Sequence, residues 1–294
     1  MRIGDNRMFT EDMAEEIFSA LRKAGLSCGE LWIPDGVEEL APGALAGRRE
    51  LKTVRLPKTL RKIGAIAFYG CESLEQITLP VGLVEIGTAA FKNSGLREVT
   101  VPSKATQLGS EIFADTALHC AEIKGRRIGA AMFRGCRQLT RVQLDRNIRI
   151  IEKGAFRECS ALKTLRLPEK LERIEEEAFW NCERLERVAM PEGVKEIGDG
   201  AFYGCAFENI RVPEKIAEIR HETFGECKKL KTIHFPAELK RIDGDAFYGC
   251  PALKMVRFDA ELTAVQKIQI GEGNESLTRA LLSCGVGNEA GNVP

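Results

Sequence analysis

Histidine and cysteine are the side chains that most often carry catalysis or bind metals, and this chain of 294 residues has three histidines and ten cysteines. His119, His221 and His234 share no spacing, so no His-x-x-x-His or mixed Cys/His metal motif occurs. Zinc ligands ordinarily lie about two to four residues apart, whereas most of these cysteines recur every 22 or 23 residues. No nucleophile-elbow, phosphate-loop or dinucleotide glycine motif is present. The sequence therefore predicts no catalytic residue, no metal site and no cofactor.

The cysteines form a column of the sequence rather than a cluster. The members of this column are Cys71, Cys136, Cys159, Cys182, Cys205, Cys227 and Cys250. Ser94 and Thr116 occupy the same position in two other repeats, which a disulfide framework would not tolerate. A free cysteine in an apolar interior behaves as a small hydrophobic side chain. We therefore predict a ladder of buried, reduced thiols.

Basic residues gather at positions that are expected to face solvent on short strands. In the second half of the chain these positions carry no acid, and they hold Arg141, Arg166, Arg187, Arg211, His234 and Arg257. In the first half they carry Glu30, Glu98 and Glu122, with Arg55 as the basic member. The pattern predicts a basic surface that binds an acidic protein segment or an anionic glycan. The alternative is a solvated strand face that long arginine side chains shield.

Aromatic side chains form a second candidate surface. Trp180 and Tyr203 each follow an inward-facing phenylalanine by one residue and belong to neighbouring repeats. They predict an aromatic patch suited to contact with a protein or a sugar. The alternative is that each ring packs against the neighbouring turn.

A repeat of about 23 residues must position these side chains. Leu51–Ser73 reads LKTVRLPKTLRKIGAIAFYGCES, and Leu162–Arg184 reads LKTLRLPEKLERIEEEAFWNCER. From Cys28 the unit recurs about ten times, with phenylalanine, proline and isoleucine or leucine each in a fixed column. A fixed period of this length is typical of a solenoid, in which each unit stacks only on its neighbours.

Each unit predicts two short extended pieces followed by a turn. Val54 and Leu56 alternate with polar residues, the pattern of a half-buried strand. Pro57 lacks an amide hydrogen and ends that strand. Ile63 begins the next corner, and Phe68 lies in a short helical turn that points it into the interior. Corresponding strands of successive units are expected to pair in parallel with right-handed crossovers.

The unit, written LxxIxLPxxLxxIGxxAFxxC, resembles the BspA-like leucine-rich repeat family of bacteria and some protists. The resemblance covers about residues 28 to 261 and rests on nine phenylalanines and eight prolines in register. It implies an α/β repeat: a right-handed leucine-rich repeat solenoid with parallel strands, short helical turns and a helical N-terminal cap. It also implies protein–protein contact, and many relatives are surface proteins implicated in adhesion. The resemblance carries over no catalytic residue.

The two ends of the chain predict caps. Residues 1–9 are expected to be frayed, and Thr10 to cap a helix over about 11–24 that Gly25 ends. The apolar face of this helix is expected to consist of Met13, Ile17, Leu21 and Ala24. We predict an N-terminal capping helix in 1–27, the solenoid in 28–262, and a C-terminal cap with a disordered tail in 263–294. Residues 118–138 are two residues short, which predicts a kink or bulge near 120–127.

Composition excludes several classes of function. Lysine plus arginine balances aspartate plus glutamate at 43 each, so no nucleic-acid partner is expected. No apolar run is long enough to cross a membrane, so no membrane insertion is expected. The acidic start of the chain lacks a signal peptide and predicts a cytoplasmic protein, or a surface or secreted one if an upstream signal was removed.

Three functions remain open. The first is a non-catalytic module, expected to be a monomer, that binds a protein through its strand face. The second is an exported bacterial adhesin for a host matrix protein or glycan. The third is a structural, self-associating array.

Overall fold

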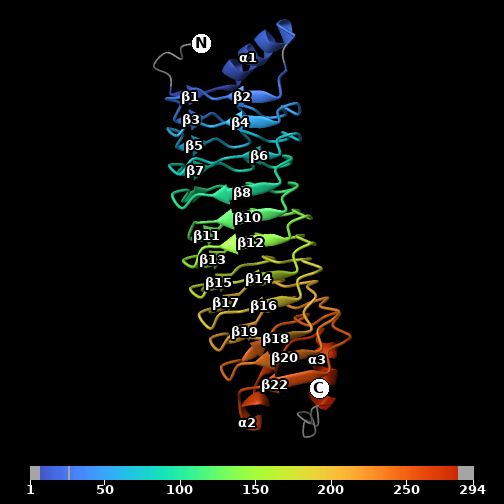
Figure 1. Ribbon diagram of the computed structural model, residues 1–294. Coiled ribbons are helices and arrows are strands. Elements are labelled where there is room, and N and C mark those ends of the chain that lie inside the picture. The colour runs from blue at the N-terminus through green and yellow to red at the C-terminus, as the bar shows by residue number, and fades with distance from the viewer. Residues whose placement is uncertain (1–6, 26, 284–294) are drawn as a thin grey trace. The chain divides into compact units, whose positions relative to one another are not determined.

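The structure, a computed structural model, describes residues 7–25 and 27–283. The chain divides into two units, Met1–Ile148 (unit 1) and Arg149–Pro294 (unit 2). Each unit is a stack of coils, and each coil contributes two short strands that pair in parallel with the corresponding strands of neighbouring coils (Figure 1). The predicted parallel-strand solenoid is therefore confirmed. The predicted disordered tail, residues 285–294, lies outside the described residues.

Unit 1 contains α1 (Glu11–Lys23), β1 (Met8–Phe9) and the strands of its coils. The first strands of its coils are β2 (Glu30–Trp32), β4 (Thr53–Arg55), β6 (Gln76–Ile77), β8 (Glu98–Val101), β10 (Cys120–Ile123) and β12 (Arg141–Leu144). The second strands are β3 (Glu39–Leu40), β5 (Lys62–Ile63), β7 (Glu85–Ile86), β9 (Gln107–Leu108) and β11 (Arg127–Ile128). They form the sheets β2-β4-β6, β8-β10-β12 and β1-β3-β5-β7-β9.

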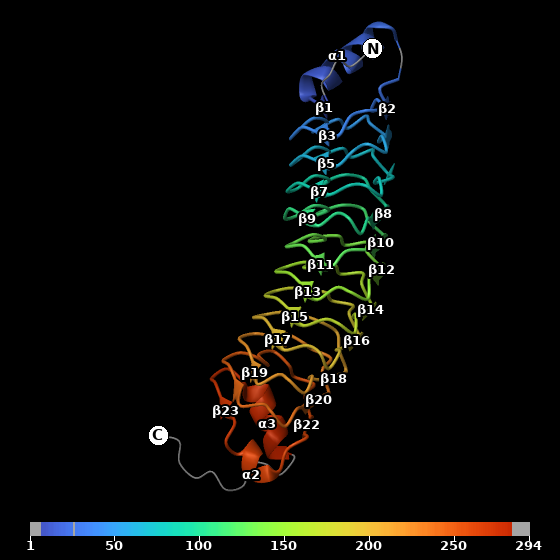
Figure 2. The ribbon, with the colours of Figure 1, turned by 90° about the vertical axis from the view of Figure 1, so that its left-hand side faces the viewer.

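Unit 2 repeats the plan and ends in two helices. Its first strands are β14 (Thr164–Arg166), β16 (Arg187–Ala189), β18 (Asn209–Arg211), β20 (Thr232–Phe235) and β22 (Met255–Phe258). Its second strands, which face the viewer in Figure 2, are β13 (Ile150–Ile151), β15 (Arg173–Ile174), β17 (Glu196–Ile197), β19 (Glu218–Ile219), β21 (Arg241–Ile242) and β23 (Gln269–Ile270). The helices are α2 (Leu262–Val265) and α3 (Glu275–Ser283). β14 pairs with β16, β18-β20-β22 and β19-β21-β23 form sheets, and β13, β15 and β17 pair in order.

The segment around each phenylalanine differs from the expected short helical turn. It is a chain of tight turns, and the residues two before and two after the phenylalanine have positive φ, as at Ile66 (51°) and Gly70 (67°) around Phe68. A left-handed residue on each side breaks the run of helical dihedral angles. The freed amides instead bond to the next coil, as Phe68 N–H does to the carbonyl of Ala90 at 2.7 Å.

The core of each coil is its phenylalanine, as predicted. Phe68 and Phe91 stack in unit 1 with ring centroids 4.9 Å apart, and Phe179 and Phe202 stack in unit 2 at 5.3 Å. These four rings are fully buried. The cysteine column lies beside them and is buried, and its thiols contact carbonyls of an earlier coil, as Cys182 does with Phe156 at 3.1 Å. Every cysteine among the described residues is free of disulfides.

The N-terminal helix caps unit 1, although its buried face differs from the prediction. Thr10 caps the helix by accepting a hydrogen bond from the Met13 amide at 3.4 Å. Ala14 and Phe18 are the fully buried positions, whereas Met13 is half-buried and Ala24 is exposed. The prediction that residues up to 9 are frayed is wrong for β1, because Met8–Phe9 pairs with β3 and Phe9 is buried.

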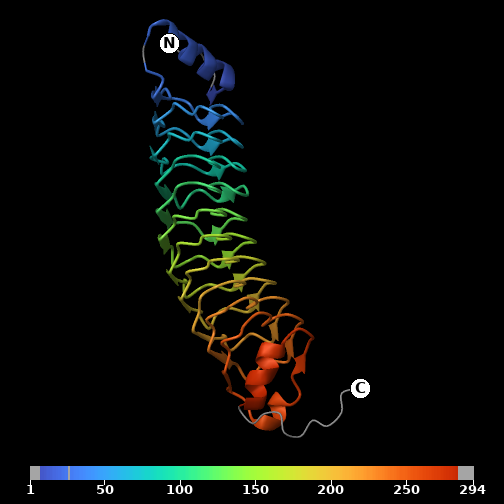
Figure 3. The ribbon, with the colours of Figure 1, turned by 90° about the vertical axis from the view of Figure 1, so that its right-hand side faces the viewer.

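The C-terminal helix α3 lies beside the last coil of unit 2 (Figure 3). Asn274, which directly precedes α3, is 3% exposed. Its side-chain oxygen accepts a hydrogen bond from the Phe247 amide at 3.0 Å, and its side-chain nitrogen donates to the Asp243 carbonyl at 2.8 Å. Asn274 therefore attaches the cap to the preceding coil.

The expected bulge near 120–127 is absent from the strand. β10 pairs with β8 and with β12 through four consecutive residues each, without a register shift. The shortening lies instead in the connection between β10 and β11, which consists of only Lys124, Gly125 and Arg126. A surface connection shortens at less cost than a strand with hydrogen bonds on both sides.

Candidate functional site

The first strands of unit 2 present five of the six predicted basic residues to solvent. Arg166, Arg187, Arg211 and Arg257 are exposed on β14, β16, β18 and β22, and His234 is half-buried on β20. Arg141 is exposed on β12 and belongs to unit 1. The central residues of the strands, such as Leu165 and Ile210, are buried. The period-2 alternation in the sequence is the reason for this division.

Arg211 and His234 both contact an acid, Asp259, which lies outside the strand positions that predict the basic stripe. The Arg211 guanidinium contacts Asp259 Oδ2 at 2.7 Å, and His234 Nε2 lies 2.7 Å from Asp259 Oδ1. Arg211 Nη1 lies 2.8 Å from His234 Nδ1. These contacts suit an imidazole that donates from Nε2 and accepts at Nδ1. Asp259 directly follows β22 and so lies outside the alternating strand positions from which the stripe was predicted. An acid immediately after this strand was the only sign of the cluster in the sequence.

The Arg211–His234–Asp259 cluster has only part of a catalytic arrangement. A histidine held by an aspartate is two thirds of a nucleophilic triad. Among the described residues, however, His234 has no hydrogen bond with a serine, threonine or cysteine side chain. The cluster therefore ties β18 and β20 to the residue that follows β22 and neutralises part of the predicted stripe.

In unit 2, three arginines of the stripe carry charge that no ion pair compensates among the described residues. Arg166, Arg187 and Arg257 make no ion pair within the part of the chain that the structure describes. On β14 and β16, Thr164 pairs with Arg187 and Arg166 pairs with Ala189, so the two arginines are diagonal neighbours on one face. Two exposed guanidinium groups in this arrangement favour a carboxylate or sulfate from another molecule.

The second strands of unit 2 carry as many charges but compensate them. Arg173 lies 3.6 Å from Glu196, which also contacts Arg220 at 3.0 Å. Arg241 lies 3.6 Å from Glu218 in the neighbouring coil. Opposite charges on adjacent strands attract, whereas like charges repel. The second-strand face is therefore internally balanced, and the first-strand face is not.

Trp180 and Tyr203 lie in contact with each other, and most of their surface packs against the protein itself. Their rings stack with centroids 3.9 Å apart and planes 7° apart. A side chain added at Gly200 would meet the Trp180 ring at 2.6 Å, and one added at Gly225 would meet Tyr203 at 2.8 Å. Each ring thus lies against the backbone of the following coil and is half-buried. Burial, followed by the nearby carboxylate of Glu226, raises the pKa of Tyr203.

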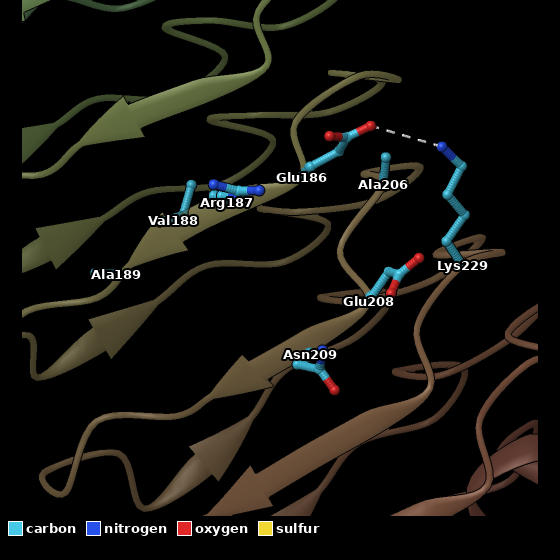
Figure 4. Close-up of a pocket in the computed structure, with 8 residues that line it drawn as sticks. All are labelled: Glu186, Arg187, Val188, Ala189, Ala206, Glu208, Asn209 and Lys229. Carbon is cyan, nitrogen blue, oxygen red and sulfur yellow. Dashed lines mark ion pairs between the residues drawn. The ribbon is translucent and has the colours of Figure 1, made fainter.

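A hollow of about 630 Å³ opens between β16 and β18, on the first-strand face of unit 2. Figure 4 shows its walls, which include Arg187, Val188 and Asn209. Glu186 and Lys229 form an ion pair at 3.8 Å, and Ala206 lies close to this pair in the close-up. The hollow was not predicted from the sequence. The available signal was the coil that contains β18, which reaches its first strand with one residue fewer than the preceding coil.

A search of curated proteins gives no match. A family model gives a clear one: the model of the BspA type leucine rich repeat region, in six copies, matches residues 23–140, 121–227 and 195–271. The chain belongs to this family. The predicted resemblance is thereby confirmed.

Solved structures of other leucine-rich repeat proteins are similar to this one. A leucine-rich repeat protein from Bacteroides ovatus is 27% identical with a TM-score of 0.62, over 83% of this chain and 62% of the other. This leucine-rich repeat chain thus spans less than two thirds of that relative. The pneumococcal vaccine antigen PcpA has the same fold at 19% identity and a TM-score of 0.52, over 83% of this chain and 79% of the other.

Within residues 7–25 and 27–283, no three histidine, cysteine, aspartate or glutamate side chains converge to hold a metal ion. None of the helices in those ranges has the length and apolar character needed to cross a bilayer.

Unit 1 offers a different exposed feature on its first strands. Trp32 on β2 is 64% exposed, and the Arg55 guanidinium of β4 lies 4.5 Å from the centre of its ring. A cation over an indole face is a stable arrangement. A tryptophan in a column of mostly polar residues was the sequence signal for it.

Proposed function

We propose that this protein is a non-catalytic interaction module whose first-strand face in unit 2 binds the acidic surface of a partner protein. The observation that carries the proposal is the unbalanced charge of Arg166, Arg187 and Arg257 on that face. Uncompensated arginines on a solvent-facing sheet contribute little to the stability of the fold. Their charge attracts acidic partners and accelerates the encounter with them.

Charge reversal tests the proposal with defined probes. The Arg166→Glu/Arg187→Glu variant is compared with Arg173→Glu/Lys195→Glu, which changes the net charge equally on the second-strand face. We expect immobilised poly-glutamate to bind the wild type and the second variant, and the first variant to lose at least tenfold in affinity. Thermal melts check that both variants fold, since exposed ion pairs are worth about 1 kcal/mol or less. Equal binding by the two variants contradicts the proposal.

The same assay separates the other two functions. Heparin that binds more tightly than poly-glutamate, and loses that binding in the Arg166→Glu/Arg187→Glu variant, favours an adhesin for anionic glycans. A large homo-oligomer in size-exclusion chromatography with light scattering favours a self-associating array. We expect a monomer, because the exposed arginines of one copy repel those of another.

A further inference from the structure

Both ladders of strands are interrupted between the same two coils of unit 2. β16 is bonded to β14 and β18 to β20, with no bonding between β16 and β18. On the second-strand side β17 pairs with β15 and β19 with β21. The turns still hold the two coils together, since Phe202 N–H bonds to the Thr223 carbonyl at 2.9 Å and Gly204 N–H to the Gly225 carbonyl at 2.8 Å. The coils therefore separate on their strand sides only.

The interruption coincides with a coil that is one residue shorter than the coil before it. Ile210 follows Cys205 by five positions, whereas Val188 follows Cys182 by six. The shorter path draws Phe207 into the core, where it is fully buried against the edge of Phe202 at 5.5 Å. Val188, at the centre of β16, is left half-buried.

The interruption leaves main-chain donors without partners at the hollow. Val212 N–H bonds to the His234 carbonyl at 2.9 Å, on the β20 side. Successive amides of a strand point to opposite sides, so the amides of Arg211 and Asn209 point toward β16. No partner for either amide exists within the described residues. An edge of this kind pairs readily with another extended chain.

Of the charged side chains that line the hollow between β16 and β18, Arg187 alone makes no ion pair with another described residue. Glu186 is paired with Lys229, and Glu208 with Lys231 at 3.1 Å. Arg187 lines the hollow without an ion pair, with Arg166 beside it. A second hollow of about 500 Å³ meets the first at Ala206 and Lys229. Two connected hollows suit an elongated occupant rather than a compact one.

We propose that the interruption between β16 and β18 is a docking groove for an extended acidic segment of a partner protein. The carbonyls of the segment accept hydrogen bonds from the amides of Asn209 and Arg211, and a carboxylate of the segment contacts Arg187. The ion pair between Glu186 and Lys229 closes over the segment. This inference rests on the proposed function and specifies where and how the partner is held.

Unit 1 supplies the variant that tests the groove. It has a corresponding short coil, where Arg97 takes the place of Glu208 and contacts Glu75 at 2.9 Å. Glu208→Arg is expected to form the equivalent pair with Glu186 and close the groove. Glu238→Arg, at an exposed loop position, makes the same change of charge elsewhere. Asn209→Trp fills the hollow from an exposed strand position and serves as a second blocking variant.

The probe is a fluorescent nonapeptide of alternating threonine and glutamate, with an analogue N-methylated at alternate residues. We expect the wild type and Glu238→Arg to bind the peptide, and Glu208→Arg and Asn209→Trp to lose at least tenfold. Attraction by charge alone predicts the opposite for Glu208→Arg, since it adds positive charge. We expect N-methylation, which prevents β-pairing of the peptide, to cost at least tenfold. Hydrogen exchange at the Asn209 and Arg211 amides is expected to be fast in the free protein and slow with the peptide.

The outcomes separate the groove from the proposed function. Equal binding of the peptide by Glu208→Arg and Glu238→Arg, or equal binding of the N-methylated analogue, overturns the groove. If poly-glutamate binding is lost in Arg166→Glu/Arg187→Glu but the nonapeptide does not bind at all, the groove is overturned and the proposed function stands. If neither probe binds the wild type, both are overturned.

Discussion

Two coils, one in each unit, reach their first strand by a path that is one residue shorter than that of the preceding coil, and they accommodate the loss differently. In unit 1 Val99 follows Ser94 by five positions, and in unit 2 Ile210 follows Cys205 by five. Both losses interrupt the ladder, between β6 and β8 and between β16 and β18. In unit 1 the Arg97 amide still bonds to the Glu75 carbonyl at 3.0 Å, whereas in unit 2 the corresponding amide of Glu208 bonds to no carbonyl among the described residues.

Two residues explain the difference. Gly95 N–H bonds to the Cys71 carbonyl at 3.2 Å, and a Cβ at Gly95 would lie 2.1 Å from the carbonyl oxygen of Glu72. The corresponding Ala206 cannot approach so closely and bonds to the Leu185 carbonyl at 3.1 Å instead. Arg97 then attracts Glu75, whereas Glu208 has the same charge as Glu186. A close backbone approach and an ion pair bring the start of β8 within hydrogen-bonding distance of the preceding coil, and without them the start of β18 stays out of reach.

The largest expected effect is a loss of stability at alkaline pH, and this loss differs between the two units. Burial raises the pKa of the Cys71, Cys136 and Cys250 thiols to about 12, and holds those of Cys205 and Cys227 well above 9.0. Above pH 9 the unfolded chain loses protons that the folded chain keeps. Stability is therefore fully present below pH 9 and falls by roughly 1.4 kcal/mol per pH unit for each buried thiol as pH rises toward 12.

Unit 2 is expected to lose stability more steeply than unit 1, because it holds more of the cysteine column. Hydrogen exchange by mass spectrometry in urea, between pH 8 and 10.5, reports each unit separately. Cys227→Ala is the matched variant and is expected to reduce the slope of unit 2 alone. Identical slopes in the two units are incompatible with this prediction.

An exchange of small residues tests the backbone approach itself. Gly95→Ala places a methyl group against the Glu72 carbonyl and is expected to cost about 3 kcal/mol in the free energy of unfolding. Ala206→Gly meets no such barrier and is expected to cost about 0.5–1 kcal/mol through backbone entropy. Urea unfolding measures both. Similar losses in the two variants would mean that the close approach at Gly95 is not what closes the coil of unit 1.

The smallest expected effect concerns Ser94 and Cys205, the side chains that start the two paths compared above. Ser94 is buried and its hydroxyl has no partner among the described residues, whereas the Cys205 thiol donates to the Phe179 carbonyl at 3.3 Å. We expect Ser94→Cys to stabilise unit 1 by about 1 kcal/mol, because it removes an unsatisfied hydroxyl. Thermal unfolding measures the gain, with Thr116→Cys as control, since the Thr116 hydroxyl already bonds to the Phe113 carbonyl at 2.8 Å. A gain at Thr116 as large as at Ser94 would refute this account.

The sequence by itself determined the repeat and the side chains that each coil buries. Phenylalanine, cysteine and the alternating strand residues are read from their spacing, because a fixed period places equivalent residues at equivalent depths. The exposure of Arg166 and Arg187 follows from the same alternation. The N-terminal helix follows from Thr10 and Gly25, although its buried face is shifted by one residue, because Phe18 supplies the largest apolar side chain.

Only the tertiary structure decided which charges are balanced and where the ladder opens. Asp259 lies 48 residues after Arg211 and contacts it because β18, β20 and β22 are adjacent. The hollow at Ala206 depends on whether a backbone can come within contact of the preceding coil, a condition on distances of a few ångströms. The repeat pattern predicts which side chains are buried and which face solvent, but not whether the backbones of two neighbouring coils come into contact. That is why the contact between Arg211 and Asp259 and the opening beside Ala206 appear only in the fold.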